Sequence, residues 1–393
     1  MRKTTLKLVT LMKINIIGGG ISGLALGFFA KRAGFDFTIY ESSHKCGGVV
    51  ATQITPFGLI HHGPHLTRLS LELKDVLDYL TVDYLKAEKI GRFLLKNRKI
   101  DKISPNFWQY FEILWSIFRK RKHKYESLGD FAMHHFGKTT ANVQIQALVN
   151  GIFACNVEEL HETALKSIYF TEKRAIYSIL KKIFGKKRKN QGKVQIIRPV
   201  DGFQTLIDAL VEYLRENIVF DHQITKIDQN SSSFITIPAY LVPKLEGVPE
   251  NIGKICEKIR YQTLCVATIF TENKIELEGV GCLSNSNEGI LGVLFNSSAF
   301  RETYTSYSVF YKNFTKKHVD EWFADFFGVK IVKSYHFEYK NAIPLHNYAV
   351  HDLILQNSGN TKIFSNYCGQ ISLSEIFTNA KNEISNLKFQ DKV

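Results

Sequence analysis

The chain has 393 residues, of which 45% are hydrophobic and 12% aromatic, and its formal net charge is +14. This composition excludes a disordered polypeptide and predicts two or three folded domains. No apolar run reaches the ~18–20 residues that a membrane-spanning helix needs, and the apolar part of the first twelve residues is too short for a signal peptide. We therefore expect a cytoplasmic protein.

The segment from residue 14 to residue 41 contains every part of a dinucleotide-binding βαβ unit in order. A short apolar strand leads into Gly18, Gly20 and Gly23, a helix follows, and a second strand ends at Glu41. Gly18 permits a tight turn, Gly20 lets a pyrophosphate approach the backbone, and Gly23 lets the helix and strand pack closely. Glu41 is placed to accept hydrogen bonds from a ribose 2′-hydroxyl. The segment predicts dinucleotide binding.

The residues after Glu41 indicate which dinucleotide binds. The glycine pair Gly47 and Gly48 follows closely, and Gly63 and Pro64 form a second turn. Both features resemble the extended flavin signature of the amine oxidase superfamily, in which the loop after the ribose-binding glutamate wraps the FAD diphosphate. An NAD dehydrogenase needs neither feature, so FAD is the predicted cofactor. Val49 stands where that superfamily usually has Arg or Lys.

The cysteines and a group of three histidines are the side chains most suited to bind a metal. The six cysteines show neither CxxC pairs nor the spacing of metal ligands, so we predict no disulfide and no metal. His61, His62 and His65 flank the Gly63–Pro64 turn, where a base or a metal ligand is one interpretation. We favour ordinary polar loop residues.

Two basic blocks carry much of the positive charge, one at 119–124 (RKRKHK) and one at 181–189. The first directly follows the aromatic stretch 106–118. Aromatic rings beside cations are typical of a site at an anionic membrane surface, and a solvated basic loop is the equal alternative. No nucleic-acid-binding motif accompanies either block, so we predict no nucleic-acid partner.

The remaining chain alternates helices and strands. Apolar spacing predicts a helix over 70–82, a hairpin over 92–104, and helices over 126–150 with a break at Gly137. A turn, a helix and a strand follow within 198–227, strands dominate 256–340 around one helix, and the last forty residues give a strand, a turn and a helix. Similar strand and helix units at both ends and in the middle indicate two interleaved domains.

Four segments together resemble the protoporphyrinogen oxidase family, FAD-dependent enzymes of haem synthesis within the amine oxidase superfamily. They are residues 126–161, 288–302, 341–353 and 363–377, and they occur in the family's order over most of the chain. The resemblance implies oxidation of a porphyrinogen, either protoporphyrinogen IX or coproporphyrinogen III, to the porphyrin. A methylene bridge gives up a hydride to flavin N5 and an N–H proton is lost, so no catalytic side chain is predicted.

The resemblance also implies the architecture, an α/β fold with three parts. These are a Rossmann-like FAD-binding domain (12–68, 194–245 and 355–393), a mixed-sheet substrate domain (69–105 and 246–354) and a helical membrane-facing subdomain (106–193). Further FAD contacts are implied at Ile224 in a middle strand and at Asn366 and Ile371 in the C-terminal turn. The tetrapyrrole is implied to lie against Arg92, which faces a propionate, and against the backbone of Gly151.

The chain departs from the family pattern at three glycine positions, occupied here by Cys155, Ser365 and Gln370. Side chains are costly where a backbone takes positive φ or approaches a ring closely, so a changed substrate stays open. Two other functions stay open as well. One is a flavin isomerase like UDP-galactopyranose mutase, which has a similar segment around HHGPHL, and the other is a non-catalytic flavin-binding or lipid-surface protein. A homodimer is also left open.

Overall fold

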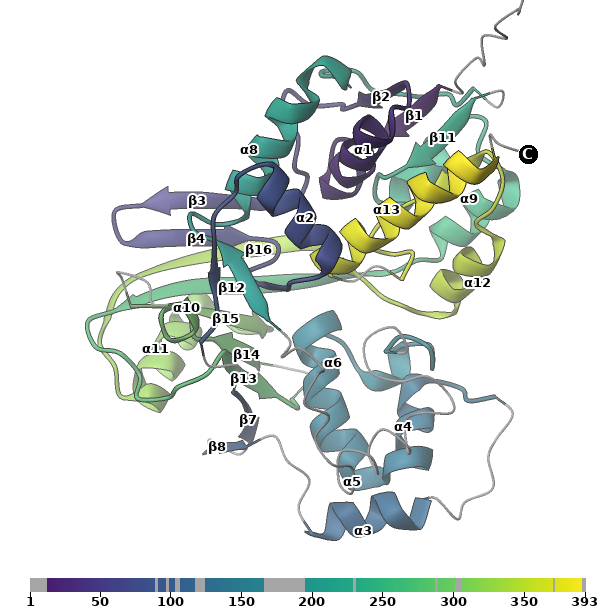
Figure 1. Ribbon diagram of the computed structural model, residues 1–393. Coiled ribbons are helices and arrows are strands. Elements are labelled where there is room, and N and C mark those ends of the chain that lie inside the picture. Colours follow the sequence, from purple (N-terminus) through teal and green to yellow (C-terminus); the bar gives the residue numbers. More distant parts are fainter. Residues whose placement is uncertain are drawn as a thin grey trace, which may run out of the picture.

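The computed structural model describes residues 13–390 apart from 89–90, 97–98, 103–106, 117–123, 166–194, 229–230, 287–288, 301–304 and 370–371. Three parts follow one another from top to bottom in Figure 1. They are a parallel sheet covered by helices, a large mixed sheet, and a group of helices at the end of that sheet.

The five-stranded sheet is parallel throughout, in the order β10-β2-β1-β11-β17. Its strands are β1 (Ile14–Ile17), β2 (Phe37–Tyr40), β10 (Ile218–Val219), β11 (Ser232–Ile235) and β17 (Thr361–Ile363). Helices α1 (Ile21–Ala33), α8 (Phe203–Leu214) and α13 (Leu373–Gln390) cover one face, and α9 (Glu250–Glu257) and α12 (Tyr348–Gln356) cover the other. Because both faces are covered, β1 is apolar on both sides: Ile16 belongs to the first core and Ile17 to the second.

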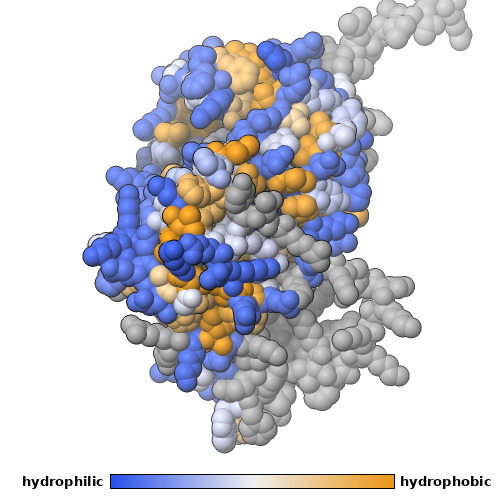
Figure 2. Space-filling model, turned by 90° about the vertical axis from the view of Figure 1, so that its left-hand side faces the viewer, coloured by the Kyte–Doolittle hydropathy of each residue, from blue (hydrophilic) through white to orange (hydrophobic). Residues whose placement is uncertain are grey.

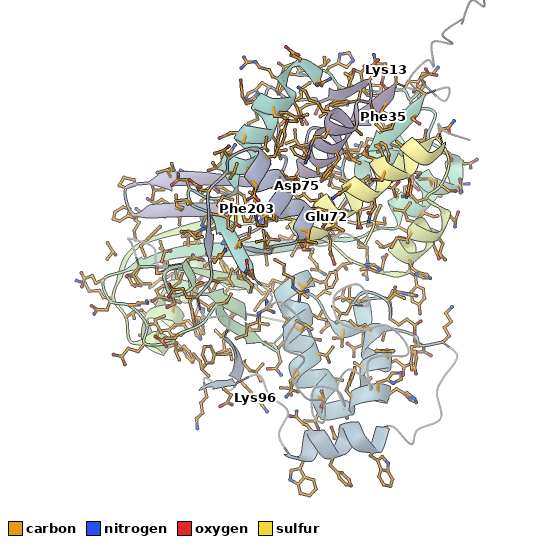
Figure 3. The ribbon with its side chains drawn as sticks, viewed as in Figure 1. Lys13, Phe35, Glu72, Asp75, Lys96 and Phe203 are labelled. Carbon is orange, nitrogen blue, oxygen red and sulfur yellow. The ribbon has the colours of Figure 1, made fainter. Side chains whose placement is uncertain are left out.

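Helix α2 (Leu71–Tyr79) confirms the helix expected at 70–82, but it packs in the first core of the parallel sheet. The domain bounds expected from the sequence place this helix in the substrate domain (69–105). Glu72 accepts a hydrogen bond from Thr378 of α13 at 2.8 Å, and Asp75 pairs with Arg32 of α1 at 2.6 Å. Figure 3 labels Glu72 and Asp75 on this helix. Its apolar stripe therefore completes the helical layer of the dinucleotide part.

The strand expected around Ile224 ends earlier than predicted. Strand β10 comprises only two residues, Ile218–Val219. Asp221 has a φ of +51°, and this left-handed backbone ends the extended conformation. Ile224 lies half-buried in the irregular segment that follows, packed against the second core.

The seven-stranded sheet has the order β16-β12-β15-β14-β13-β7-β8. Strands β7 and β13 pair in parallel and the other neighbours are antiparallel, so the sheet is mixed as predicted. The expected hairpin at 92–104 is confirmed as β7 and β8. The strands are β7 (Arg92–Lys96), β8 (Lys99–Lys102), β12 (Tyr261–Thr271), β13 (Gly281–Ser284), β14 (Gly289–Leu294), β15 (Ser306–Lys312) and β16 (Ile331–Pro344).

The two faces of this sheet have different neighbours. Helix α11 (Lys316–Phe327) covers one face, where its Val319 and Phe323 join Tyr307 and Val309 of β15 in a core. We call the opposite face, which carries Ser308 and Phe310 of β15, the inner face. It meets the hairpin of β3 (Ala51–Thr55) and β4 (Gly58–His62) and the residues after it.

A three-stranded sheet of β5 (Thr67–Arg68), β9 (Ile196–Pro199) and β6 (Tyr84–Lys86) links the parallel sheet to the large one.

Figure 2 shows the side of the molecule that lies at the left of Figure 1. Hydrophobic residues there form separate patches among hydrophilic ones.

The helical unit comprises α3 (Phe107–Ser116), α4 (Leu128–Phe136), α5 (Lys138–Thr140), the π-helical turn η1 (Ala141–Ile145) and α6 (Gln146–Phe153). The break expected at Gly137 is confirmed, with a φ of +84°. A hydrophobic core joins these helices to one another and to Leu345, which follows β16. Helix α3 projects side chains outward (Figure 3), and the exposed ones include Trp108 at 72%, Phe111 at 54% and Trp115 at 60%.

Within the described ranges, no helix is both long and apolar enough to cross a bilayer. The basic stretches 119–123 and 181–189 lie outside the described residues. A membrane-facing role of the helical unit therefore stays a prediction.

Candidate functional site

The three N-terminal glycines have different surroundings. A Cβ added to Gly23 would lie 2.0 Å from the carbonyl oxygen of Gly18, and one added to Gly18, whose φ is +112°, would lie 2.8 Å from Thr236 Oγ1. Gly23 is therefore required for α1 to pack against the turn after β1, and Gly18 for that turn to pack against the residues that follow β11. Gly20 has ordinary extended backbone (φ −69°), and an added Cβ would meet no atom within 4 Å. Open space thus lies over Gly20 at the N-terminus of α1, where a phosphate is favoured.

Glu41 lies at the end of β2 beside this loop. Its Oε2 accepts the N–H of Gly19 at 2.7 Å, and its Oε1 accepts the N–H and the hydroxyl of Ser43, both at 2.9 Å. These bonds hold the carboxylate next to the glycine loop.

The glycine pair Gly47 and Gly48 returns to the same loop. Both have positive φ (+112° and +61°). The N–H of Gly47 donates to Gly19 O at 2.9 Å, and a Cβ on Gly48 would lie 3.5 Å from Gly20 Cα. Six residues predicted to bind the cofactor are thereby brought together: Gly18, Gly20, Gly23, Glu41, Gly47 and Gly48. The open glycine backbone and the adjacent carboxylate fit the diphosphate and a ribose of FAD.

The turn at Gly63 and Pro64 continues this surface. Gly63 has a φ of +76°, and an added Cβ would lie 2.6 Å from the carbonyl oxygen of Val49. Glycine is therefore needed for the turn to pack on the chain that follows Gly48. The turn leads directly to His65. The centroid of its ring lies 5.2 Å from the ring centroid of Phe310 on the inner face. Residues 63–65 connect the glycine loop with the large sheet.

The histidines around this turn are not the polar loop residues that the sequence suggests. His61 and His65 are buried, at 3% and 7% exposure. His61 Nε2 lies 3.1 Å from Nη1 of Arg198 in β9, and His65 Nδ1 lies 3.2 Å from Ser308 Oγ. Burial lowers the pKa of His61 and lowers that of His65 to about 3, so both rings are neutral at pH 7.

No cluster of three or more metal-ligating side chains occurs in the part of the chain that the structure describes. The arginine partner of His61 was missed by the sequence reasoning. Arg198 is 1% exposed, and an arginine in a strand is usually a surface residue.

Strand register shows which residues share the inner face, because directly paired residues point to the same side of a sheet. Arg92 of β7 pairs with Gly281 of β13. Gly281 pairs in turn with Leu294 of β14, and Leu294 pairs with Ser308 of β15, so these four residues form one row across the sheet. The next row runs from Leu94 through Leu283 and Gly292 to Phe310. Arg92 therefore lies on the same face as the residues that contact His65. It is exposed, at the β7 end of this face.

Gly151 meets the same face from the helical unit. An added Cβ would lie 2.6 Å from Leu283 Cδ2, so glycine lets α6 approach β13 closely. The structure thus brings Arg92 and Gly151 to one end of the inner face and the Gly63–His65 turn to another part of it.

Half-buried aromatic side chains occupy the β16 part of the inner face, which the sequence reasoning also missed. Phe337 pairs with Val266 and Tyr339 with Leu264, and Val266 in turn pairs with Phe310. The Tyr339 hydroxyl is hydrogen-bonded to His62 Nδ1, and burial raises the pKa of Tyr339 to about 12. Alternating side chains at 308–312 (SVFYK) and 336–339 (HFEY) indicate that each strand has two different faces. Only the pairing of the strands shows which of the two faces α11 covers.

Two comparisons with known sequences bear on this arrangement. The model of a family described as an NAD(P)-binding Rossmann-like domain matches residues 16–80. Mitochondrial protoporphyrinogen oxidase of Nicotiana tabacum is 26% identical over 243 residues, which are 52% of this chain and 48% of that protein. Protoporphyrinogen oxidase 2 of Arabidopsis thaliana is 24% identical over 368 residues, 73% of this chain and 72% of that protein. The chain thus matches about half the length of the tobacco relative.

Two solved structures are similar in fold to this chain over nearly its whole length. A candidate protoporphyrinogen oxidase from Exiguobacterium sp. 255-15 has a TM-score of 0.74 at 16% identity, covering 96% of this chain and 99% of that one. Reduced UDP-galactopyranose mutase has a TM-score of 0.77 at 13% identity, covering 96% of each chain. The chain has the fold of the FAD-dependent amine oxidases. The predicted α/β class, with a Rossmann-like part and a mixed sheet, is confirmed.

In this amine oxidase fold the C-terminal turn lies beside the glycine loop. The Tyr367 hydroxyl donates to Ile237 O at 2.9 Å, and Ile237 Cγ2 is 3.0 Å from the position of a Cβ on Gly18. Asn366, half-buried, lies in the turn, whereas Gln370 and Ile371 fall outside the described residues.

Two of the departures from the family's glycines do not put the substituted residue itself at positive φ. Neither Cys155 nor Ser365 is among the residues with positive φ, and in the first of these turns Ala154 takes the left-handed conformation instead, with a φ of +51°.

Proposed function

We propose that the protein is an FAD-dependent oxidase that converts a porphyrinogen, protoporphyrinogen IX or coproporphyrinogen III, to the porphyrin in haem biosynthesis. The observation that carries the proposal is the connection of the glycine loop to the inner face through Gly63 and His65. A ligand held over Gly20 is thereby led towards a half-buried aromatic sheet face. The similarity to two plant protoporphyrinogen oxidases supports a tetrapyrrole as the substrate.

The side chains present suit this reaction. FAD supplies the hydride acceptor when it is bound. The glycine loop and Glu41 hold the dinucleotide, and the rings of Phe310, Phe337 and Tyr339 offer a flat apolar surface for a tetrapyrrole. The guanidinium of Arg92 is available to a propionate carboxylate.

The test is anaerobic mixing of the flavin-loaded protein with each porphyrinogen. We expect the visible flavin absorption to bleach, and porphyrin fluorescence to appear when air is admitted. A colourless variant, Gly20→Leu, controls for spontaneous porphyrinogen oxidation. A flavoprotein that is bleached by neither porphyrinogen contradicts the proposal.

A mutase is the second candidate, favoured by the TM-score of 0.77 to UDP-galactopyranose mutase. Chemically reduced protein is therefore assayed with UDP-galactofuranose. Conversion of this sugar without bleaching by porphyrinogens would establish the mutase in place of the oxidase. Bound flavin with neither activity would indicate a non-catalytic flavin protein.

Replacing Arg92 by alanine is expected to raise KM for the porphyrinogen about tenfold and leave kcat nearly unchanged. A propionate contact is made in the ground state and the transition state alike, and the exposed position of Arg92 limits its value to roughly 1–2 kcal/mol. Steady-state kinetics measure the change.

Arg92→Lys should recover part of the lost affinity. Lys96→Ala, at the other end of β7 (Figure 3), is the matched control and should have a normal KM. A fall in kcat alone would argue against a propionate contact.

We also propose that α3 attaches the protein to an anionic membrane surface. Its exposed Trp108, Phe111 and Trp115 supply apolar area, while Gln109 on the other side is hydrogen-bonded to Gln144. The adjoining cations add roughly 1 kcal/mol each near anionic lipid.

The test is sedimentation with liposomes. We expect binding that rises with the content of anionic lipid and falls with salt. The double variant Trp108→Ser/Trp115→Ser should no longer bind. Leu355→Ser, at an exposed site on α12, is the control. Binding that depends on neither lipid charge nor salt would mean that α3 and the basic residues do not attach the protein.

A further inference from the structure

One histidine lies between the chain that leaves the glycine loop and the aromatic part of the inner face. His62, the last residue of β4, pairs with Ala51 of β3, three residues beyond Gly48. The next residue, Gly63, begins the turn that packs on the chain after Gly48. On its other side the His62 ring meets that of Phe337 in β16, with ring centroids 4.9 Å apart and ring planes at 80°. His62 therefore adjoins both the dinucleotide loop and the aromatic surface.

The two ring nitrogens of His62 have different surroundings. Nδ1 is hydrogen-bonded to the hydroxyl of Tyr339, whereas Nε2 has no hydrogen-bond partner among the residues that the structure describes. The ring is half-buried, and Nε2 is not among the buried polar atoms, so this nitrogen is open to a ligand or to water. His61 differs, because it is buried and its Nε2 lies against Arg198.

The protonation of this pair suits a proton acceptor. Burial lowers the pKa of His62 from its ordinary 6.5 and raises the pKa of Tyr339 to about 12, so at pH 7 the imidazole is neutral and the phenol keeps its proton. A neutral imidazole with its proton on Nδ1 has a lone pair on Nε2. The other titratable groups near the ring, among the described residues, are the neutral His61 and His65, and β3 presents Ala51.

The proposed oxidation releases a proton for every hydride. A C–H bond of a methylene bridge breaks, and its electron pair leaves with the hydrogen as hydride, which FAD accepts when it is bound. An N–H bond of a neighbouring pyrrole then breaks, and its electron pair stays on nitrogen and completes the conjugated double bonds. The proton needs an acceptor, and an imidazole with a pKa near the working pH is an effective one.

We propose that His62 is the base of this reaction, with its Nε2 accepting the pyrrole proton at the aromatic surface. The proton leaves the substrate nitrogen, the lone pair of Nε2 forms the new N–H bond, and the half-exposed ring passes the proton on to water. Tyr339 is a positioning residue, because its oxygen accepts the hydrogen bond of Nδ1–H and so keeps the lone pair on Nε2. The inference rests on the proposed function and adds to it the residue that takes the proton.

The first experiment observes the ring itself, by nitrogen NMR of isotope-labelled histidine in flavin-loaded protein without substrate. The signals of His62 are identified by their loss in His62→Gln. At pH 7 we expect the proton on Nδ1, and titration should protonate Nε2 only below the ordinary pKa of 6.5. Tyr339→Phe removes the acceptor and should raise the share of the Nε2–H form about threefold or more. A wild-type ring with its proton on Nε2 would overturn the proposal.

The second experiment measures the rate of flavin bleaching on anaerobic mixing with saturating porphyrinogen. His62→Gln keeps a polar side chain but no base, so bleaching should be roughly 100-fold slower. The wild-type rate should fall about tenfold per pH unit below the pKa of His62, because the protonated ring cannot accept a proton, and the variant should lack this fall. Free imidazole should restore the rate of His62→Ala about tenfold or more.

The matched control is His318→Gln, which removes an exposed histidine from α11 on the opposite face of the sheet and should bleach at the wild-type rate. If His62→Gln does not fold, Tyr339→Phe gives the same information, since bleaching should be about tenfold slower and the acidic fall displaced. Equal rates for wild type and His62→Gln at equal flavin content, or a slow His62→Ala that imidazole does not restore, would refute the base. A wild type that neither porphyrinogen bleaches would refute the proposed function and the base with it, so the two failures are distinguishable.

Discussion

Replacing Gly20 by leucine is expected to abolish FAD binding and leave the fold intact. The backbone at Gly20 has ordinary φ, and an added Cβ meets no protein atom within 4 Å. The leucine side chain would therefore fill the space that a pyrophosphate needs, at little cost to the folded protein. Flavin absorbance of the purified protein, and titration of the apoprotein with FAD, measure the effect. Wild type should show the two visible flavin bands, and the variant should be colourless.

The control for Gly20→Leu is Gly253→Leu on α9. Gly253 also has ordinary φ and open space around an added Cβ, so both variants add the same side chain at a permissive site. Thermal unfolding without FAD should be close to wild type for both. Normal flavin content in Gly20→Leu would show that the diphosphate does not lie over this residue. A colourless wild type that takes up no added FAD would contradict cofactor binding altogether.

Gly23→Ala is expected to destabilise the protein by about 3 kcal/mol or more, at the upper end of the overpacking range. The new methyl group would lie 2.0 Å from the carbonyl oxygen of Gly18, a backbone atom that cannot move unless α1 moves away from β1. Urea unfolding measures the loss. FAD binding should weaken in parallel, because the glycine loop is displaced with the helix.

Gly27→Ala in the same helix separates this effect from helix propensity. An added Cβ there would lie 2.7 Å from Ile39 Cδ1, the end of a flexible side chain that can rotate away. We expect a loss smaller by at least 1 kcal/mol than that of Gly23→Ala. Equal losses for the two variants would mean that contact with the Gly18 carbonyl is not the cause.

The parts of the fold that sequence predicted correctly are local. The βαβ unit, α2, the β7–β8 hairpin and the break at Gly137 each depend on residues close in the chain. What α2 packs against was not predicted, because an amphipathic stripe shows that a helix is buried and not which partner buries it. The strand around Ile224 was also misplaced, since an aspartate permits left-handed backbone, as at Asp221, but does not require it.

Local residue patterns predicted the candidate site only where it is continuous in sequence, whereas Arg92 and Gly151 came from the family resemblance. Gly18 to Gly48 form one such stretch. The inner face depends on the parallel pairing of Arg92 with Gly281 and on register across three further strands, and such distant pairings leave no periodic signal. The burial of Arg198 likewise involves His61 of β4, 137 residues away in the sequence.

The attachment of the helical unit to the large sheet has a consequence for how a ligand enters and leaves. The unit touches the inner face through Gly151 at Leu283, and Asn150 donates to Ser284 O at 2.8 Å. On another side, Leu345 from beyond β16 packs in the core of the unit. We expect a bulky product to leave past this end of the sheet only when such contacts break, so product release rather than hydride transfer would limit turnover.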